Sequence, residues 1–205
     1  MSILPIILYP NPLLKTVCKP VEKVTKEIQK LVDDMAETMY AAPGVGLAAP
    51  QVGRNERVIV LDVTWREETK ERVLHQLINP KIIRREEKID WEEGCLSIPG
   101  FLQMMERSAK VTATALDKKG KPMTIQAEGL LAVCLQHEID HLDGKLIIDK
   151  ISRLKKNLYM DKLKKGEFEP SYPSILRKLF FLAPMILPFL RYKRSRNRSI
   201  KFWGS

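Results

Sequence analysis

The sequence predicts a domain of the α+β class, because helical and strand patterns alternate along one chain of 205 residues. Two stretches repeat apolar residues at the three- and four-residue spacing of an amphipathic helix. Several β-branched runs and one hairpin pattern indicate strands. A chain of this length is sufficient for one domain with a buried core, with or without an appendage.

The first elements of the chain are a short extended segment and a helix that packs on the core. Residues 3–8 form an apolar run that ends at Pro10 and Pro12, which is typical of an extended segment followed by a turn. Thr25 is suited to cap a helix whose apolar positions fall at i, i+3, i+4, i+7 and i+11. These positions are Ile28, Leu31, Val32, Met35 and Met39. We expect this helix to end at Pro43 and to serve the core alone.

The next segment, residues 44–51, is rich in small residues and reads G-V-G-L-A-A-P-Q. Such residues let another backbone approach closely, and glycine adopts conformations that other residues cannot. The pattern of a phosphate-binding loop is absent. One interpretation is a plain turn between helix and strand. The other is an edge that binds an extended peptide and ends in Gln51, whose side-chain amide can donate a hydrogen bond into a site.

The middle of the chain contains the patterns of several strands. They cover residues 58–63, 73–78, 81–90, 111–116 and 123–127, of which the last two flank a hairpin turn. The second run is expected to end at Asn79 and Pro80. It contains His75, which lies outside any ligand spacing and is interpreted as an ordinary strand histidine.

A metal-binding pattern, H-E-x-x-H, lies in an apolar run that begins at Leu130. In a helix, His137 and His141 lie one turn apart on the same face, where two imidazoles can hold one divalent metal. Glu138 lies beside them, and a carboxylate next to such a metal can accept the proton of a bound water. A solvated helix face with two histidines is the alternative interpretation. Against it, both histidines continue the apolar stripe of Leu130 and Cys134.

The cysteines are sparse and odd in number, and they lack the spacing of a disulfide framework: Cys18, Cys95 and Cys134. Together with an N-terminus that lacks the order of a signal peptide, this predicts a reduced, cytosolic protein. Cys95 precedes a Pro-Gly turn and has three interpretations: a nucleophile with His137 as its base, a third metal ligand, or an inert buried thiol. We favour the ligand, because two histidines four residues apart suit a metal, whereas a Cys-His pair needs only one.

Three segments resemble, in order, the signature motifs of the peptide deformylase family: residues 44–51, residues 93–97 (E-G-C-L-S) and residues 136–141 (Q-H-E-I-D-H). The resemblance implies an α+β domain in which antiparallel sheets surround a central metal-binding helix. The family pattern ends near residue 165. We therefore expect a metallohydrolase domain over residues 1–165 and an extra C-terminal extension over residues 166–205.

The resemblance also implies the reaction, which is removal of the formyl group from the N-terminal formylmethionine of nascent polypeptides, with release of formate. The implied metal ligands are Cys95, His137 and His141. Glu138 would be the base, while the Gln51 side chain and the Leu96 backbone N–H would stabilise the oxyanion. The implied metal is ferrous iron, and zinc or nickel suits the same ligands.

The family further implies where the peptide binds. Val45 and Gly46 would pair with the substrate backbone as an added strand. The methionine side chain would enter an apolar pocket to which the metal helix contributes Leu130, Val133 and Cys134. Arg107 falls where the family tends to have an arginine, and it either orders the cysteine loop or is an ordinary surface residue.

The net charge of +10 is concentrated near the C-terminus, since residues 150–205 contain 15 Lys and Arg against 3 Asp and Glu. Only this part argues for an anionic partner. Residues 153–165 fit a basic helix, through which the family implies contact with the ribosome. Residues 179–190 are uncharged, but they are too few for a membrane span, which needs about 20 residues. Basic residues follow directly at 191–198. The whole stretch 179–198 predicts attachment to RNA or to the cytoplasmic leaflet, or else packing on its own domain or a second copy.

Two other classes of function remain open from the residues alone. One is a different hydrolase, either a metallopeptidase with the same H-E-x-x-H or a thiol amidase that uses Cys95. A metallopeptidase of that kind normally takes a third His or Glu downstream, and His141 is the last histidine. The other is a non-catalytic protein of the ribosome or membrane with a structural metal, which would have no use for Glu138 or Gln51.

Overall fold

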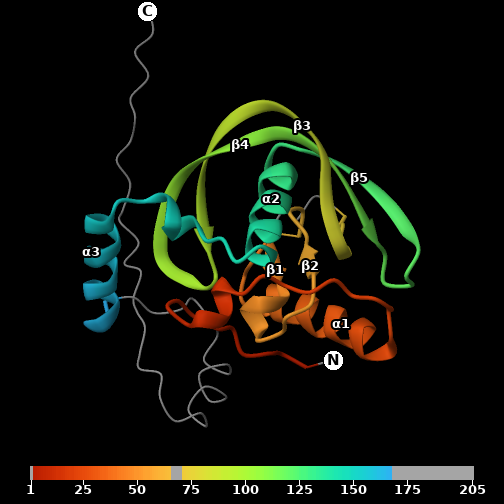
Figure 1. Cartoon of the computed structure of the whole chain (residues 1–205), viewed down its shortest axis with the longest axis horizontal. Coiled ribbons are helices and arrows are strands. Elements are labelled where there is room, and N and C mark those ends of the chain that lie inside the picture. Colours follow the sequence, from red (N-terminus) through yellow and green to blue (C-terminus); the bar gives the residue numbers. More distant parts are fainter. Residues whose placement is uncertain (1, 66–70, 168–205) are drawn as a thin grey trace, which may run out of the picture.

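Figure 1 shows the computed structural model of the chain, which describes residues 2–65 and 71–167. Within these residues, five strands form one antiparallel sheet in the order β1-β2-β3-β4-β5. The strands are β1 (Gly46–Ala48), β2 (Val58–Leu61), β3 (His75–Cys95), β4 (Ile98–Leu116) and β5 (Pro122–Glu128). The α-helices are α1 (Lys26–Ala41), α2 (Leu130–Leu142) and α3 (Arg153–Lys164). The α+β class predicted from the sequence is confirmed.

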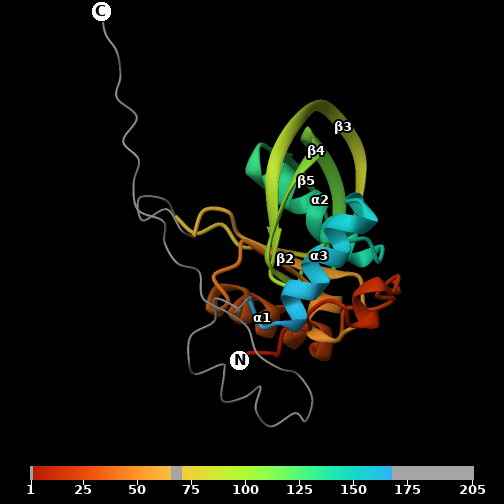
Figure 2. The ribbon, with the colours of Figure 1, turned by 90° about the vertical axis from the view of Figure 1, so that its left-hand side faces the viewer.

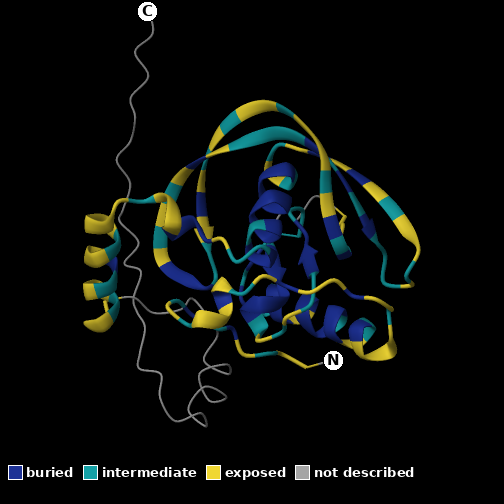
Figure 3. Ribbon diagram, in the orientation of Figure 1, coloured by how far each residue is buried: buried dark blue, intermediate teal, exposed yellow. Residues whose placement is uncertain are grey.

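The sheet surrounds α2, as the family resemblance implied. β3 and β4 form a long, curved ribbon that arches over this helix, and β5 continues the arch (Figure 1). α1 lies at the base of the molecule, beneath β1 and β2. Figure 3 shows that α2 is almost wholly buried, whereas much of the outer surface of the arch is exposed. The functional helix therefore occupies the centre of the domain.

The predicted first helix is confirmed as α1, and it ends two residues before Pro43. Its N-cap is Thr25, whose side chain accepts a hydrogen bond from the backbone N–H of Ile28. The predicted apolar positions are buried and pack against Leu47, Val58 and Val60 of β1 and β2. Full burial of one such side chain contributes about 1.5–3 kcal/mol, so this face anchors the helix.

β2 is apolar along its whole length because both of its faces are covered. Val58 and Val60 face the α1 side of the core, whereas Ile59 and Leu61 belong to the cluster around α2. All four side chains are fully buried. An uninterrupted apolar run is typical of a strand covered on both sides.

The expectation that the second strand ends at Asn79 and Pro80 is wrong, because β3 continues to Cys95. The register shifts between Ile78 and Lys81, and Asn79 adopts a positive φ of 53° there. The Asn79 side chain accepts a hydrogen bond from the N–H of Val21 and donates one to its carbonyl, both at 2.8 Å. A bulge of this kind accommodates a proline, which has no N–H for the sheet.

α2 begins after Gly129 and ends at a turn that contains Gly144. Its C-terminal turn has Gly144 at φ 68°, where a Cβ would lie 2.5 Å from the carbonyl oxygen of Lys15. Only glycine fits so close to another backbone. Asp143 is the C-cap of the helix.

α3 confirms the basic helix predicted for residues 153–165. Figure 2 views the molecule from the side on which α3 lies. The helix packs through Tyr159, Met160 and Leu163 on residues of β4, while Leu154 and Leu158 remain 70% and 54% exposed. The predicted apolar and basic run, residues 179–198, lies outside the described residues. In the part of the chain that the structure describes, no helix is long and apolar enough to cross a membrane.

Candidate metal centre

The three residues proposed as metal ligands come together between the end of β3 and the middle of α2. One ligand atom each of Cys95, His137 and His141 lies within 4.8 Å of the other two. The Cys95 Sγ is 3.2 Å from Nε2 of His141. The two imidazole rings are 5.0 Å apart between centroids, as expected for neighbours one helical turn apart. Both histidines are buried.

A tight turn positions the cysteine. Cys95 pairs with Ile98 across the β3–β4 ribbon, so Leu96 and Ser97 form a two-residue connection directly after it. Ser97 and Ile98 are fully buried, and the Ser97 carbonyl accepts a hydrogen bond of 2.8 Å from the N–H of Tyr9. The N-terminal segment thereby fixes the turn that presents the thiol.

Glu93 orients His137, a role that our reading of the sequence missed. Its Oε2 lies 2.8 Å from Nδ1 of His137. Strand spacing from Cys95 did not reveal this role, because the register shifts between Gly94 and Cys95. A carboxylate at Nδ1 favours the tautomer that leaves Nε2 for a metal, and ligating histidines usually have such a partner.

Arg107 fixes Glu93 and connects it to α2. Its Nε and Nη2 donate to the two carboxylate oxygens of Glu93 at 2.6 and 2.9 Å, and its Nη1 donates to Asp140 at 2.6 Å. The Arg107 side chain is only 8% exposed, so the alternative of a surface arginine is wrong. Burial raises the pKa of Glu93, but the hydrogen bonds from Arg107 and His137 outweigh it and lower the pKa below its ordinary value. Glu93 is therefore ionised beside the histidine.

Glu138 lies one residue after His137 and is buried. Its pKa is shifted in the direction opposite to that of Glu93. Its Oε2 has no hydrogen-bond partner among the described residues. Burial raises the pKa of Glu138 to about 7, although the nearby His137 opposes the rise. Buried polar atoms nearly always have a partner, so this oxygen suits a water or substrate group.

Gln51 brings the glycine-rich segment to the same place. Its Oε1 accepts a hydrogen bond of 2.8 Å from the N–H of Ala48. This contact turns Nε2 toward Cys95 and Ser97. Nε2 lies 3.6 Å from the Cys95 Sγ and 3.2 Å from Oγ of Ser97. The side chain is almost completely buried. The predicted amide donor thus points at the cysteine.

β1 passes directly over the metal helix. A Cβ on Gly46 would lie 2.3 Å from Oε1 of Glu138 and 2.8 Å from the Sγ of Cys134, so glycine is required here. The Val45 carbonyl lies 3.5 Å from the same Sγ. β1 is the first strand of the sheet and pairs with β2 alone within the described residues.

The three residues predicted to line an apolar pocket lie along α2 on the approach to the histidines. Cys134 and Val133 are buried, whereas Leu130 is partly exposed at the start of the helix. Val133 is only 2% exposed and lies one helical turn before His137 on α2. Its position suits a side chain that lines a site.

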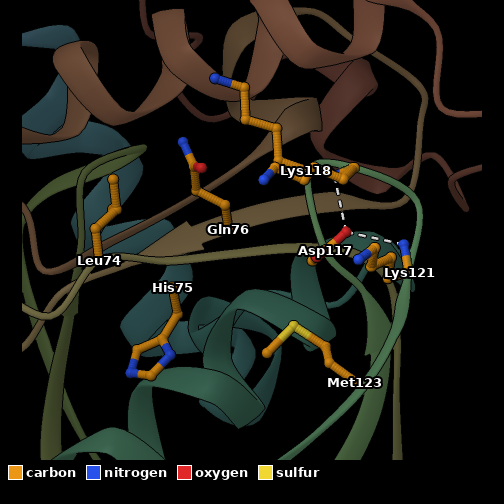
Figure 4. Close-up of a pocket in the computed structure, with 8 residues that line it drawn as sticks. Leu74, His75, Gln76, Asp117, Lys118, Lys121 and Met123 are labelled. Carbon is orange, nitrogen blue, oxygen red and sulfur yellow. Dashed lines mark hydrogen bonds between the residues drawn. The ribbon is translucent and has the colours of Figure 1, made fainter.

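A separate pocket of about 440 Å³ lies where β3 begins, beside the β4–β5 turn (Figure 4). Asp117 closes this turn by accepting hydrogen bonds from the N–H groups of Lys119 and Lys121 at 2.7 and 2.8 Å. His75 lines this pocket and takes no part in the metal centre. Burial lowers the pKa of His75, which agrees with an ordinary, neutral strand histidine.

Known proteins resemble this chain over nearly all of the described region. A profile of the family described as Polypeptide deformylase matches residues 3–157. A peptide deformylase of Saccharophagus degradans is 51% identical over 166 residues, which cover 80% of this chain and 94% of that protein. One of Alkalilimnicola ehrlichii is 52% identical over 165 residues, or 80% of this chain and 91% of that protein. The crystal structure of peptide deformylase from Ehrlichia chaffeensis in complex with actinonin is similar at a TM-score of 0.76 and 43% identity, covering 82% of this chain and 99% of that one.

Proposed function

The chain belongs to the peptide deformylase family, and we propose which of its residues perform the family's reaction. The reaction removes the formyl group from the N-terminal formylmethionine of nascent polypeptides and releases formate. The single observation that carries the assignment of residues is the convergence of three distant motifs, since Gln51, Cys95 and the histidines of α2 meet at one place. Identity of about half the residues to curated deformylases disfavours another hydrolase class or a purely structural metal.

Cys95, His137 and His141 would hold one divalent metal in this proposal. The donor set fits, because one thiol and two imidazoles converge within 4.8 Å and the carboxylate of Glu93 orients one of the rings. Three protein ligands leave a position for water or substrate. We assign ferrous iron, while zinc and nickel suit the same donors. Such a cation, when bound, acidifies water and polarises a carbonyl oxygen.

Glu138 is the general base in this proposal. Its buried Oε2 is the oxygen that takes the proton of the attacking water as the water oxygen bonds to the formyl carbon. Burial, the largest cause, raises the pKa of Glu138 to about 7, and a nearby cation would lower it, so the ionised form is present at neutral pH. Glu138 then passes the proton to the methionyl nitrogen as its bond to the formyl carbon breaks.

Gln51 and Leu96 stabilise the negative charge that develops on the formyl oxygen. The Gln51 amide is held by the N–H of Ala48, so its Nε2 needs no reorganisation during the reaction. The backbone N–H of Leu96 lies in the turn beside Cys95. Loss of one donor of this kind typically reduces the rate about 100- to 1,000-fold.

The peptide binds as an added strand on the edge of β1, next to Val45 and Gly46. Main-chain hydrogen bonds of this type provide affinity with little dependence on side chains, which suits an enzyme that accepts many nascent chains. Leu130, Val133 and Cys134 of α2 line the pocket for the methionine side chain.

The proposed activity is tested by formate release from a formylmethionyl peptide with anaerobically purified protein. We expect release that disappears after complete chelation and returns on addition of ferrous iron, with zinc and nickel as parallel additions. Activity that survives complete metal removal would instead support a thiol amidase. No release from fully metallated protein would contradict the assigned activity.

α3 is our candidate for contact with the ribosome in the cytoplasm, where nascent chains emerge. It carries exposed basic residues together with the exposed side chains of Leu154 and Leu158. We expect co-sedimentation with ribosomes that weakens as salt rises, because contacts of Lys and Arg with phosphates release counterions. The double substitution Lys155→Glu and Lys162→Glu should abolish co-sedimentation without affecting turnover of free peptide.

The matched control for this experiment changes two exposed lysines of the β4–β5 turn, Lys119→Glu and Lys121→Glu. Equal loss of co-sedimentation in both variants would show that net charge alone decides binding, which would contradict a specific role of α3. Attachment through residues 179–198 concerns a part of the chain outside the described residues.

A further inference from the structure

Residues that the reaction itself does not use donate hydrogen bonds to the carbonyl groups just before β1. The indole Nε1 of Trp65 donates a hydrogen bond of 2.7 Å to the carbonyl of Gly44. The N–H of Gly44 donates to the carbonyl of Met39 at 2.9 Å, in the last turn of α1. Gly44 is therefore fixed on both sides, although glycine is the residue with the greatest backbone freedom.

Asp62 fixes the next residue and the turn that carries the indole. Its N–H donates to the carbonyl of Val45 at 3.0 Å. Its carboxylate accepts hydrogen bonds from the backbone N–H groups of Thr64 and Trp65 at 2.8 and 3.1 Å. Burial raises the pKa of Asp62, but the hydrogen bonds from Thr64 and Tyr40 outweigh it and lower the pKa. A buried, ionised Asp62 thus connects the Trp65 turn to the segment that precedes β1.

Aromatic packing sets the direction of the indole. The rings of Tyr40 and Trp65 meet edge to face, with centroids 5.5 Å apart and planes at 78°. The Tyr40 hydroxyl donates to Asp62 at 2.8 Å, and the guanidinium of Arg72 lies 5.3 Å from the Tyr40 ring centroid. Because Tyr40 belongs to α1, the helix, the turn and the indole form one connected support.

We propose that Trp65 is a positioning residue for the peptide, because it holds Gly44 and thereby the edge of β1 on which the substrate pairs. This inference rests on the proposed binding of the peptide along β1. The strand has three residues and pairs with one strand in the part of the chain that the structure describes, so its own hydrogen bonds give it little stiffness. The contacts of Trp65 with Gly44, Asp62 and Tyr40 support the segment that precedes β1, so we expect its effect on peptide binding and not on the chemical step.

The test is Trp65→Phe, which keeps an aromatic ring against Tyr40 and removes the N–H donor. Formate release is measured with a formylmethionyl dipeptide and a formylmethionyl tetrapeptide, of which the longer one pairs with more of β1. We expect KM for the tetrapeptide to rise about three- to tenfold, the size expected for one lost hydrogen bond. The kcat for either peptide and the KM for the dipeptide should each change by no more than about twofold.

Trp91→Phe is the matched control, since Trp91 lies on β3 and should leave the dependence on peptide length as in the parent chain. Hydrogen exchange of the backbone amides of residues 44–48, without substrate, supplies a second measurement. We expect faster exchange there in Trp65→Phe alone.

The outcomes separate this inference from the function on which it rests. Unchanged exchange and unchanged KM for the tetrapeptide in Trp65→Phe would overturn the role of Trp65. An equal fall of kcat for both peptides would also overturn it, because that result marks general support of the fold. A parent enzyme whose KM does not depend on peptide length would overturn peptide binding along β1, while the exchange measurement would still decide whether Trp65 fixes the segment.

Discussion

Glu138→Ala is expected to reduce turnover about 100- to 10,000-fold while leaving the metal content unchanged, because a general base contributes an effect of this size. Glu138 is adjacent to His137 in sequence, but it lies outside the converging set of Cys95, His137 and His141. Its loss should therefore affect the proton transfer and spare the binding of the cation. The measurement is kcat for a formylmethionyl peptide together with metal analysis of the same preparation.

Thermal unfolding distinguishes this loss from a folding defect. A buried carboxylate oxygen without a hydrogen-bond partner costs free energy in the folded state. We thus expect the apo form of Glu138→Ala to be at least as stable as the apo parent chain. Glu128→Ala is the control, since that side chain is 76% exposed next to the metal helix. Near-normal turnover in fully metallated Glu138→Ala would exclude Glu138 as the base.

The elements that could be predicted from sequence are those determined by local patterns. The stripe of α1 and its Thr25 cap depend on neighbours within one or two turns, and the same holds for α2 between Leu130 and Asp143. The hairpin of β4 and β5 is equally local, because its turn lies between paired residues such as Leu116 and Pro122. Because local spacing determines such elements, the sequence alone was sufficient to predict these two helices and the hairpin.

The arch over α2 depends on contacts between residues far apart, and its extent could not be predicted. Asn79 looked like the end of a strand, yet its side chain bonds both backbone groups of Val21 and lets β3 continue. The first half of β4 was not foreseen, since its exposed residues pair with a mixed-charge ribbon that has little apolar signal. Long-range pairing of this kind overrides local propensity.

The candidate site shows the same division between local and distant contacts. The spacing of His137 and His141 indicated a metal on its own, because one helical turn sets their geometry. The roles of Glu93 and Arg107 required the structure, since the arginine reaches the carboxylate from the paired strand and also bonds Asp140 on α2. Residues that orient a ligand from another element have no spacing rule in the sequence.

Cys95→Ala should abolish turnover through loss of the metal itself, unlike Glu138→Ala. Removal of the thiol leaves two imidazoles, which hold a divalent cation less well than three ligands do. The metal content after desalting should therefore fall far below that of the parent chain, and turnover should fall with it. Metal analysis and formate release on the same samples check both effects.

Stability supplies an independent readout of the same substitution. A cation that binds only the folded chain stabilises it by about 2.7 kcal/mol at 100 times its Kd. We expect added metal to raise the unfolding temperature of the parent chain and to have little effect on Cys95→Ala. Cys18→Ala should respond as the parent chain does, because burial raises the pKa of the Cys18 thiol to about 11 and keeps it protonated. An equal metal-dependent shift in Cys95→Ala would remove Cys95 from the ligands and reopen its alternative role as a nucleophile.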